Sequence, residues 1–216
     1  MSANPTLVTH DHFEYLADRT ARDDAFLTEL KRAAIAEGIP EIQISPAQAS
    51  FMQILLRASK AREVVEVGTL AGYSAIWMAR ALPADGRVRT IELSPKHADF
   101  AASWIARSDV ARRVQVLRGA GKDVLAQLEN DCADAAFLDA DKSSYPTYLK
   151  ECLRIVKRGG LIMVDNAFAF GELFAKRPRD RETQAIRDFN DLMARTAGLQ
   201  AVIVPLGDGL WVGVRE

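Results

Sequence analysis

The stretch EVGTLAGYS, residues 66–74, joins a short apolar run to a helical pattern. The run before it, REVVEV at 62–67, is rich in valine, as expected for a strand buried on both faces. After it, apolar residues recur every three or four positions, which predicts a helix. Gly68 and Gly72 can adopt conformations that other residues avoid and can bring bare backbone against a ligand. The stretch is either a ligand-binding loop or a plain turn between strand and helix.

The same alternation of strand and helix continues along the chain. Four more short apolar runs predict strands at 87–92, 113–118, 134–139 and 160–165. Such alternation implies right-handed crossovers and an open, mostly parallel sheet with helices on both faces. Two last runs, 199–205 and 210–215, are separated by LGDG, which predicts an antiparallel hairpin. We therefore expect an α/β, Rossmann-like fold that ends in a hairpin.

The bulk properties fit one domain and exclude some partners. The 216 residues, 49% of them apolar, predict a single domain, 1–216, with a helical extension, 1–60, ahead of an α/β core, 61–216. Ser45 and Pro46 are typical of the start of a helix in that extension. A net charge of -1 argues against binding nucleic acid. No apolar stretch approaches the roughly 20 residues of a membrane span, and we expect a cytoplasmic protein.

An acidic residue after the second predicted strand supports a cofactor site. Glu92 lies about 20 residues past Gly72, where a carboxylate accepts hydrogen bonds from ribose hydroxyls. Ser74 and the free N–H groups of the first helical turn suit an anionic group. A glycine turn alone would predict a ligand only about half the time. Nicotinamide dinucleotide and S-adenosylmethionine both remain possible, and the lack of a G-x-G-x-x-G pattern favours S-adenosylmethionine.

Two carboxylates follow the next two predicted strands. Asp139 and Asp165 would lie about 5 Å apart if these strands are neighbours. A hard divalent cation would relieve their repulsion, and Asn166 offers a third oxygen. Magnesium is the first candidate, followed by manganese and calcium. Alternatively, the two aspartates cap helices or order loops.

Lys142 lies three residues after Asp139 and could face the same cavity. Beside a cation, its ammonium group would lose its proton more readily, which makes it a candidate general base. Lowering the pKa of a phenol from about 10 to about 7 is worth about 4 kcal/mol of phenolate population. This arrangement would suit methyl transfer to an oxygen atom.

The chain resembles the cation-dependent class I O-methyltransferases of the caffeoyl-CoA and catechol type, especially their bacterial and plant branch. The resemblance rests on EVGTLAGYS, IELSP, LRGAGKDVL, FLDADKSSYPTYL, GGLIMVDNAFAFG and PLGDGLWVGVR in this order. It implies a seven-stranded sheet, a phenolic acceptor with vicinal hydroxyls, an extension that helps to shape the acceptor pocket, and a homodimer. It also implies that Lys142 is the catalytic base and that the metal ligands are Asp139, Asp165 and Asn166. The implied cofactor contacts, with Gly72 added from the glycine loop, are Ile44, Glu66, Gly68, Thr69, Gly72, Ser74, Glu92, Ala120 and Asp139.

Two positions depart from the animal catechol enzymes. Val202 falls near their substrate-supporting acid, and Asp141 replaces the aromatic beside their catalytic lysine, which argues against catechol itself as the physiological acceptor. Two other functions are alternatives to methyl transfer. A nicotinamide-dependent oxidoreductase would leave Asp165 and Asn166 without a role, and a non-catalytic binding protein would not need Lys142.

Overall fold

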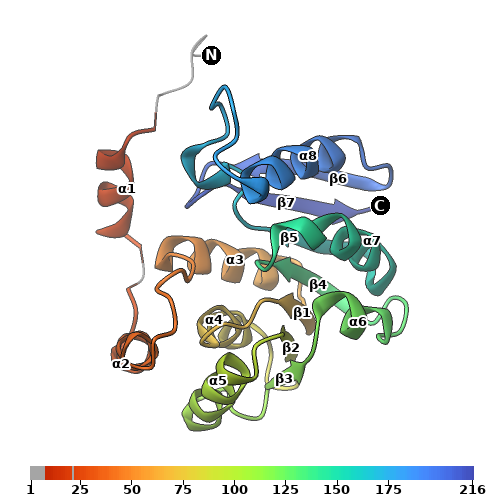
Figure 1. The fold of residues 1–216 in the computed structure, drawn as a ribbon. Coiled ribbons are helices and arrows are strands. Elements are labelled where there is room, and N and C mark those ends of the chain that lie inside the picture. The colour runs from red at the N-terminus through yellow and green to blue at the C-terminus, as the bar shows by residue number, and fades with distance from the viewer. Residues whose placement is uncertain (1–7, 21) are drawn as a thin grey trace.

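The computed structural model describes residues 8–20 and 22–216, and its centre is a seven-stranded sheet (Figure 1). The strands are β1 (Glu63–Val67), β2 (Arg87–Glu92), β3 (Val114–Arg118), β4 (Ala133–Leu138), β5 (Val156–Val164), β6 (Leu199–Val204) and β7 (Leu210–Arg215). Their order across the sheet is β3-β2-β1-β4-β5-β7-β6. The first five strands are parallel, whereas β7 runs antiparallel to both β5 and β6. The predicted fold class is confirmed, and the hairpin inserts its second strand next to β5.

Helices cover both faces of the sheet (Figure 1). Within the described residues they are α1 (His10–Ala17), α2 (Ala25–Ala36), α3 (Pro46–Ala58), α4 (Tyr73–Ala81), α5 (Pro95–Arg107), α6 (Gly121–Ala126), α7 (Tyr145–Ile155) and α8 (Arg181–Arg195), with 3₁₀ turns η1 (Lys142–Ser144) and η2 (Ala169–Gly171). Adjacent strand residues point to opposite faces, so Val64 packs with α2–α5 and Val65 packs with α7 and α8. The strands are buried on both sides, which explains their continuous apolar runs.

The N-terminal extension is tied to the core through α2 and α3. The Ser45 hydroxyl accepts the N–H of Gln48 at 3.2 Å and Pro46 opens α3, which confirms the predicted helix start. The Tyr73 hydroxyl at the start of α4 donates to Asp23 at 2.6 Å, just ahead of α2. Residues 1–7 and 21, which are part of the predicted extension, lie outside the described residues.

A helix that crosses a lipid bilayer must be about 20 residues long and mostly apolar. Among the helices in the described ranges, none is long and apolar enough to cross a membrane.

The order of the strands places the loops that carry the predicted site. The winding reverses between β1 and β4, which are hydrogen-bonded neighbours at the centre of the sheet. In open α/β sheets, ligands bind beyond the carboxyl ends of the strands at such a reversal. The loops after the five parallel strands all begin at this edge. The loops after β1, β4 and β5 contain seven of the twelve predicted site residues: Gly68, Thr69, Gly72, Asp139, Lys142, Asp165 and Asn166.

Candidate active site

The glycine loop after β1 is held close to the end of β4. Gly68 has a φ angle of +103°, and a Cβ atom there would overlap the carbonyl oxygen of Asp139. Gly72 has a φ angle of +85° at the start of α4, and a Cβ atom there would lie 3.2 Å from the Ile105 side chain. Both glycines have conformations that the fold requires, and a side chain at Gly72 would point toward α5. A contact between the Gly72 backbone and a cofactor stays a prediction.

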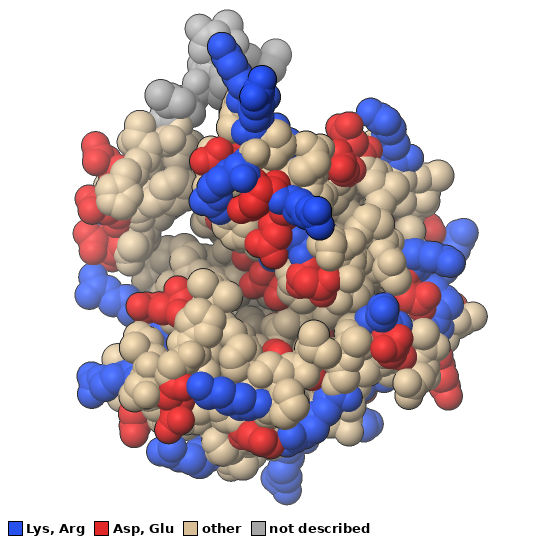
Figure 2. Space-filling view, viewed as in Figure 1, with Lys and Arg blue, Asp and Glu red and all other residues tan. Residues whose placement is uncertain are grey.

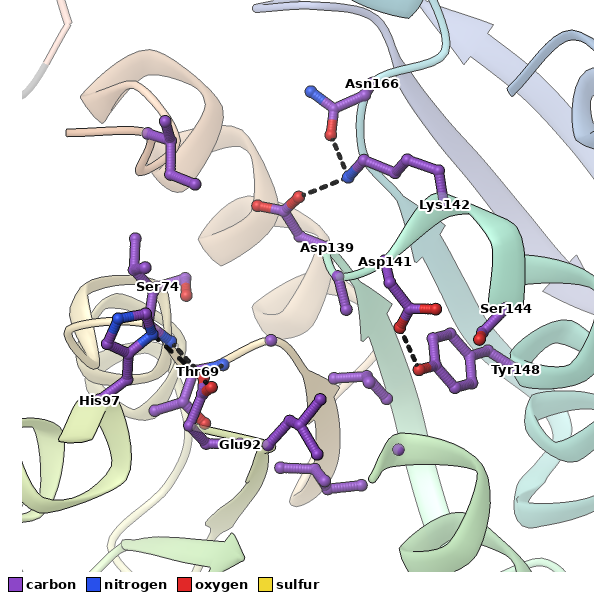
Figure 3. Close-up of a pocket in the computed structure, with 18 of the residues that line it drawn as sticks. Thr69, Ser74, Glu92, His97, Asp139, Asp141, Lys142, Ser144, Tyr148 and Asn166 are labelled. Atoms are coloured by element: carbon purple, nitrogen blue, oxygen red, sulfur yellow. Dashed lines mark hydrogen bonds and ion pairs between the residues drawn. The ribbon is translucent and has the colours of Figure 1, made fainter. Parts of the chain in front are cut away.

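A cavity of about 740 Å³ opens above these loops. Its volume lies in the range typical of sites for small molecules and cofactors. Seven of the nine predicted cofactor residues line it: Ile44, Gly68, Thr69, Ser74, Glu92, Ala120 and Asp139. In Figure 3, Glu92 and Thr69 lie on one side of the cavity, and Lys142 and Asn166 lie on another. The cavity thus joins the predicted cofactor residues to the predicted metal site.

Glu92 orders the glycine loop as well as facing the cavity. Its Oε2 accepts the N–H groups of Thr69 at 3.1 Å and Leu70 at 2.8 Å, and its Oε1 accepts the N–H of Ser94 at 2.9 Å. His97 lines the same part of the cavity and its Nδ1 lies 3.7 Å from Oε1. The sequence indicated the carboxylate but gave no sign of His97 or of this loop-ordering role.

Glu66 lies behind the cavity wall. Its side chain is fully buried on β1, and its Oε1 accepts a hydrogen bond from the Ser74 hydroxyl. Burial raises the pKa of this carboxyl to about 8, so the group is mostly neutral at pH 7. Because Ser74 lines the cavity and Glu66 lies beneath it, any effect of Glu66 on a ligand would pass through Ser74.

Lys142 lies where the loops after β4 and β5 meet. Its ammonium group donates to Asp139 Oδ1 at 3.0 Å and to Asn166 Oδ1 at 2.6 Å (Figure 3). It also donates to the Tyr145 hydroxyl at 2.8 Å. The residue is 6% exposed, so nearly all of this long side chain is enclosed. A buried ammonium with these partners is suited to exchange a proton with a molecule in the cavity.

Asp165 is the neighbour of Asp139 across the sheet. Its backbone N–H donates to Leu138 O at 3.0 Å, which confirms that the two aspartates follow adjacent strands. The side chain is buried and accepts a hydrogen bond from Gln48 Nε2 at 2.8 Å. Burial first, and then the negative charge of Asp139, raise the pKa of Asp165 above its usual value. A bound cation would relieve both effects.

The donor set fits a hard divalent cation. Carboxylate oxygens of Asp139 and Asp165 and the amide oxygen of Asn166 are the ligand type that magnesium, manganese and calcium prefer. Asp139 and Asn166 already converge on one positive charge, the Lys142 ammonium. Across residues 8–20 and 22–216, no cluster of three or more His, Cys, Asp or Glu side chains could hold a metal. The predicted site therefore depends on Asn166 for its third protein oxygen.

Three more side chains support this centre and were not predicted. Gln48 contacts Asp165, and Tyr145 contacts Lys142. Asp208, expected only as a turn residue, accepts Asn166 Nδ2 at 3.2 Å and the N–H of Phe170 at 2.9 Å. The only local signal was the S-x-x-Q pattern at 45–48, which is typical of a helix start and says nothing of a distant partner.

The stretch AKRPRDRE, residues 175–182, covers a surface loop and the first two residues of α8. Its four basic side chains are exposed, and Asp180 caps α8 by accepting the N–H of Thr183 at 2.9 Å. Figure 2 shows a hollow in this face with Asp and Glu side chains along its rim and Lys and Arg side chains above them. A solvated loop accounts for these contacts.

Comparison with known proteins identifies the family. A family model described as O-methyltransferase matches residues 17–216. The chain is 37% identical over 209 residues to a catechol O-methyltransferase of Niastella koreensis, covering 95% of this chain and 91% of that protein. An O-methyltransferase from Bacillus cereus, solved in complex with SAH, has a TM-score of 0.86 at 36% identity, covering 94% of this chain and 96% of that chain.

A second solved O-methyltransferase structure is also similar to this chain. The O-methyltransferase TomG from Streptomyces achromogenes, in complex with SAM, has a TM-score of 0.84 at 30% identity and covers 94% of each chain. These relatives decide between the two cofactors that the glycine loop left open, in favour of S-adenosylmethionine. The chain belongs to the O-methyltransferase family and is an S-adenosylmethionine-dependent O-methyltransferase.

Proposed function

We propose that the enzyme transfers the methyl group of S-adenosylmethionine to one hydroxyl of a vicinal dihydroxy-aromatic acceptor, with a divalent cation held by Asp139, Asp165 and Asn166. Magnesium is the first candidate, and manganese and calcium follow. The observation that carries the proposal is the convergence of Asp139 Oδ1 and Asn166 Oδ1 on Lys142 Nζ, at 3.0 and 2.6 Å. This oxygen-rich centre lies in the wall of the same cavity as Ser74 and Glu92.

The cofactor would lie along the glycine loop. Glu92 would accept hydrogen bonds from the ribose hydroxyls while it keeps the backbone of Thr69 and Leu70 in place. The first turn of α4, with the Ser74 hydroxyl, would face the carboxylate of the methionine part. Ala120, at the start of α6, lines the cavity from a third loop, and Ile44 lines it from the N-terminal extension.

Lys142 would act as the proton acceptor. A divalent cation bound by the two aspartates and Asn166 would lower the pKa of an acceptor hydroxyl. Lys142, in its neutral amine form, would take the proton of that hydroxyl, held in place by Tyr145 and Asn166. Bound S-adenosylmethionine would supply an electrophilic methyl group to the acceptor oxygen and would leave as the thioether. Lys142 would then release the proton to solvent.

The acceptor class is supported by a relative and by the cavity walls. The Niastella koreensis protein, 37% identical, is named a catechol O-methyltransferase. Ile42 and Phe170 line the outer part of the cavity, one from the predicted extension and one from the loop after β5. Val202, the position near the acid of the animal enzymes, has no acidic group and is 59% exposed on β6. We expect an aromatic acceptor larger than catechol, and a homodimer as the working form.

A panel of acceptors tests this proposal. Catechols, caffeate derivatives, flavonoids, coenzyme A esters and matched monohydroxy phenols are incubated with S-adenosylmethionine and magnesium, and products are identified by mass. The proposal predicts methylation of vicinal diols, little methylation of monohydroxy phenols, and loss of turnover when EDTA is added and restored by excess magnesium. Equal turnover of diols and single phenols, unchanged by EDTA, would contradict it.

A further inference from the structure

Gln48 connects the N-terminal extension to the predicted metal site. It lies in the first turn of α3, is 2% exposed, and donates from Nε2 to Asp165 Oδ1 at 2.8 Å across 117 residues of sequence. We propose that Gln48 is a positioning residue that fixes the Asp165 carboxylate for cation binding. The inference rests on the proposed function, because it needs a cation at Asp165.

The local sequence predicts a different hydrogen-bond partner for the Gln48 side chain. Ser45 is the N-cap of α3 and Gln48 is three residues later, the S-x-x-Q pattern of a capping box. In a full capping box, the side chain at this third position reaches back to the N–H of the N-cap residue. Here the Ser45 hydroxyl accepts the N–H of Gln48 at 3.2 Å, while the Gln48 amide donates to Asp165. The cap therefore fixes the backbone of Gln48 and leaves its side chain for the long-range contact.

The hairpin between β6 and β7 leaves room for the amide. Gly207 has a φ angle of +59°, and a Cβ atom there would overlap Oε1 of Gln48. Glycine at this turn thus allows the backbone of the hairpin to approach the side chain. Asp208, the next residue, accepts a hydrogen bond from Asn166 Nδ2 at 3.2 Å. The turn at 207–208 thus leaves room for Gln48, which donates to Asp165, and accepts a hydrogen bond from Asn166.

A neutral amide suits this task. An amide donor orients a carboxylate without cancelling its negative charge, whereas a lysine or arginine would compete with a metal ion. Gln48 donates to Oδ1 of Asp165, and the proposal has a cation bind this carboxylate at its other oxygen. Hydrogen-bond partners of metal ligands typically change metal affinity by about 10–100-fold when they are removed. The same range is expected for Gln48.

The test compares two glutamines of one helix. Gln48→Met removes the donor to Asp165 at similar volume, and Gln48→Asn keeps an amide on a shorter stem. Gln53→Met is the matched control, because Gln53 also lies on α3 and its Nε2 donates to the carbonyl oxygen of Trp77 at 2.6 Å. The Kd for Mn²⁺ is measured from the EPR signal of the free ion with S-adenosylhomocysteine at saturation, and the Kd for S-adenosylhomocysteine is measured without metal.

The inference predicts that both Gln48 variants bind Mn²⁺ about 10–100-fold more weakly, with unchanged S-adenosylhomocysteine affinity and a Gln53→Met value like wild type. In turnover of the best acceptor from the panel, the Mg²⁺ concentration at half-activation should rise while kcat at saturating Mg²⁺ changes little. Folded Gln48 variants that bind Mn²⁺ as wild type does, or an equal loss in Gln53→Met, would overturn it. If wild type itself fails to bind Mn²⁺, the proposed function fails as well. If wild type binds Mn²⁺ and Asp165→Ala does not, the proposed metal site holds, and the Mn²⁺ affinity of the Gln48 variants alone decides the role of Gln48.

Discussion

Gly68 and Asp139 are in contact through their backbones at the centre of the sheet. A Cβ atom on Gly68 would overlap the carbonyl oxygen of Asp139, and Gly68 also has a φ angle of +103°. The loop that faces the cofactor and the strand end that carries a predicted metal ligand are thus packed with no room for a side chain between them. The predicted cofactor loop and the predicted metal ligand Asp139 are therefore in direct backbone contact.

Replacing Gly68 should therefore damage stability and the site together. Gly68→Ala adds a methyl group against backbone at a positive φ angle, and we expect the free energy of unfolding to fall by more than about 2 kcal/mol. Urea denaturation measures this change. Gly198→Ala is the control, because Gly198 has a φ angle of +74° and nothing within 4 Å of the added atom. Similar losses in the two variants would show that backbone strain, and not the contact with Asp139, explains the effect.

Glu92→Gln should weaken cofactor binding. Both carboxylate oxygens accept backbone N–H groups, so an amide would place its own donor against the N–H of Ser94 or of Thr69 and Leu70. We expect the Kd for S-adenosylmethionine to rise by about 10-fold or more, since one mispaired buried donor costs about 1–3 kcal/mol. Isothermal calorimetry measures it, with Glu182→Gln at the cavity rim as control. An unchanged Kd would remove Glu92 from the cofactor site.

Lys142→Met should abolish most of the activity and leave the cofactor bound. The variant removes the donor to Asp139, Asn166 and Tyr145 at similar size, and general base catalysis is worth about 10²–10⁴-fold in rate. We expect kcat/KM to drop within this range, measured on the best acceptor of the panel. Lys150→Met, on the exposed side of α7, should behave as wild type. A Lys142→Met enzyme with full activity would assign the proton to another group.

Stability should fall as pH rises because of Glu66. Its folded pKa is raised by burial from 4.5 to about 8, so between these values the folded state keeps a proton that the unfolded state releases. Unfolding is then favoured by higher pH, by up to about 1.4 kcal/mol per pH unit. Glu66→Gln should flatten this slope between pH 5 and 8, whereas Glu63→Gln, partly exposed on the same strand, should not. Urea titrations at several pH values measure it, and parallel slopes for wild type and Glu66→Gln would refute a neutral Glu66.

Much of the fold could be predicted because its signals are local. The apolar run predicted at 134–139 is β4 (Ala133–Leu138), and the hairpin around LGDG was found from its turn residues. By contrast, β5 (Val156–Val164) begins four residues before the predicted 160–165. Its first part, VKRG, contains polar residues and glycine, which do not predict a strand. It pairs with β4 across a register shift between Ala133 and Ala135, and the local sequence of β5 carries no signal for that pairing.

Most of the predicted site residues lie around one cavity, but several contacts among the side chains there were not predicted. Spacing placed Asp139 and Asp165 at neighbouring strand ends, and the structure shows those strands side by side. The Gln48–Asp165 contact spans 117 residues, and no periodicity reports a pair so far apart. Gly72 was predicted as a cofactor contact, and the structure adds a packing reason for glycine there, because a Cβ atom would lie 3.2 Å from Ile105 of α5. Side-chain packing between distant elements decides these points.

The most direct measurement for the metal-dependent account is anomalous diffraction from crystals grown with Mn²⁺ and S-adenosylhomocysteine. The account predicts one strong anomalous peak bound by oxygens of Asp139, Asp165 and Asn166, at roughly 2.0–2.3 Å, next to the sulfur of the cofactor. Under these conditions, Asp139 and Asp165 directed away from each other with no anomalous density between them would contradict it.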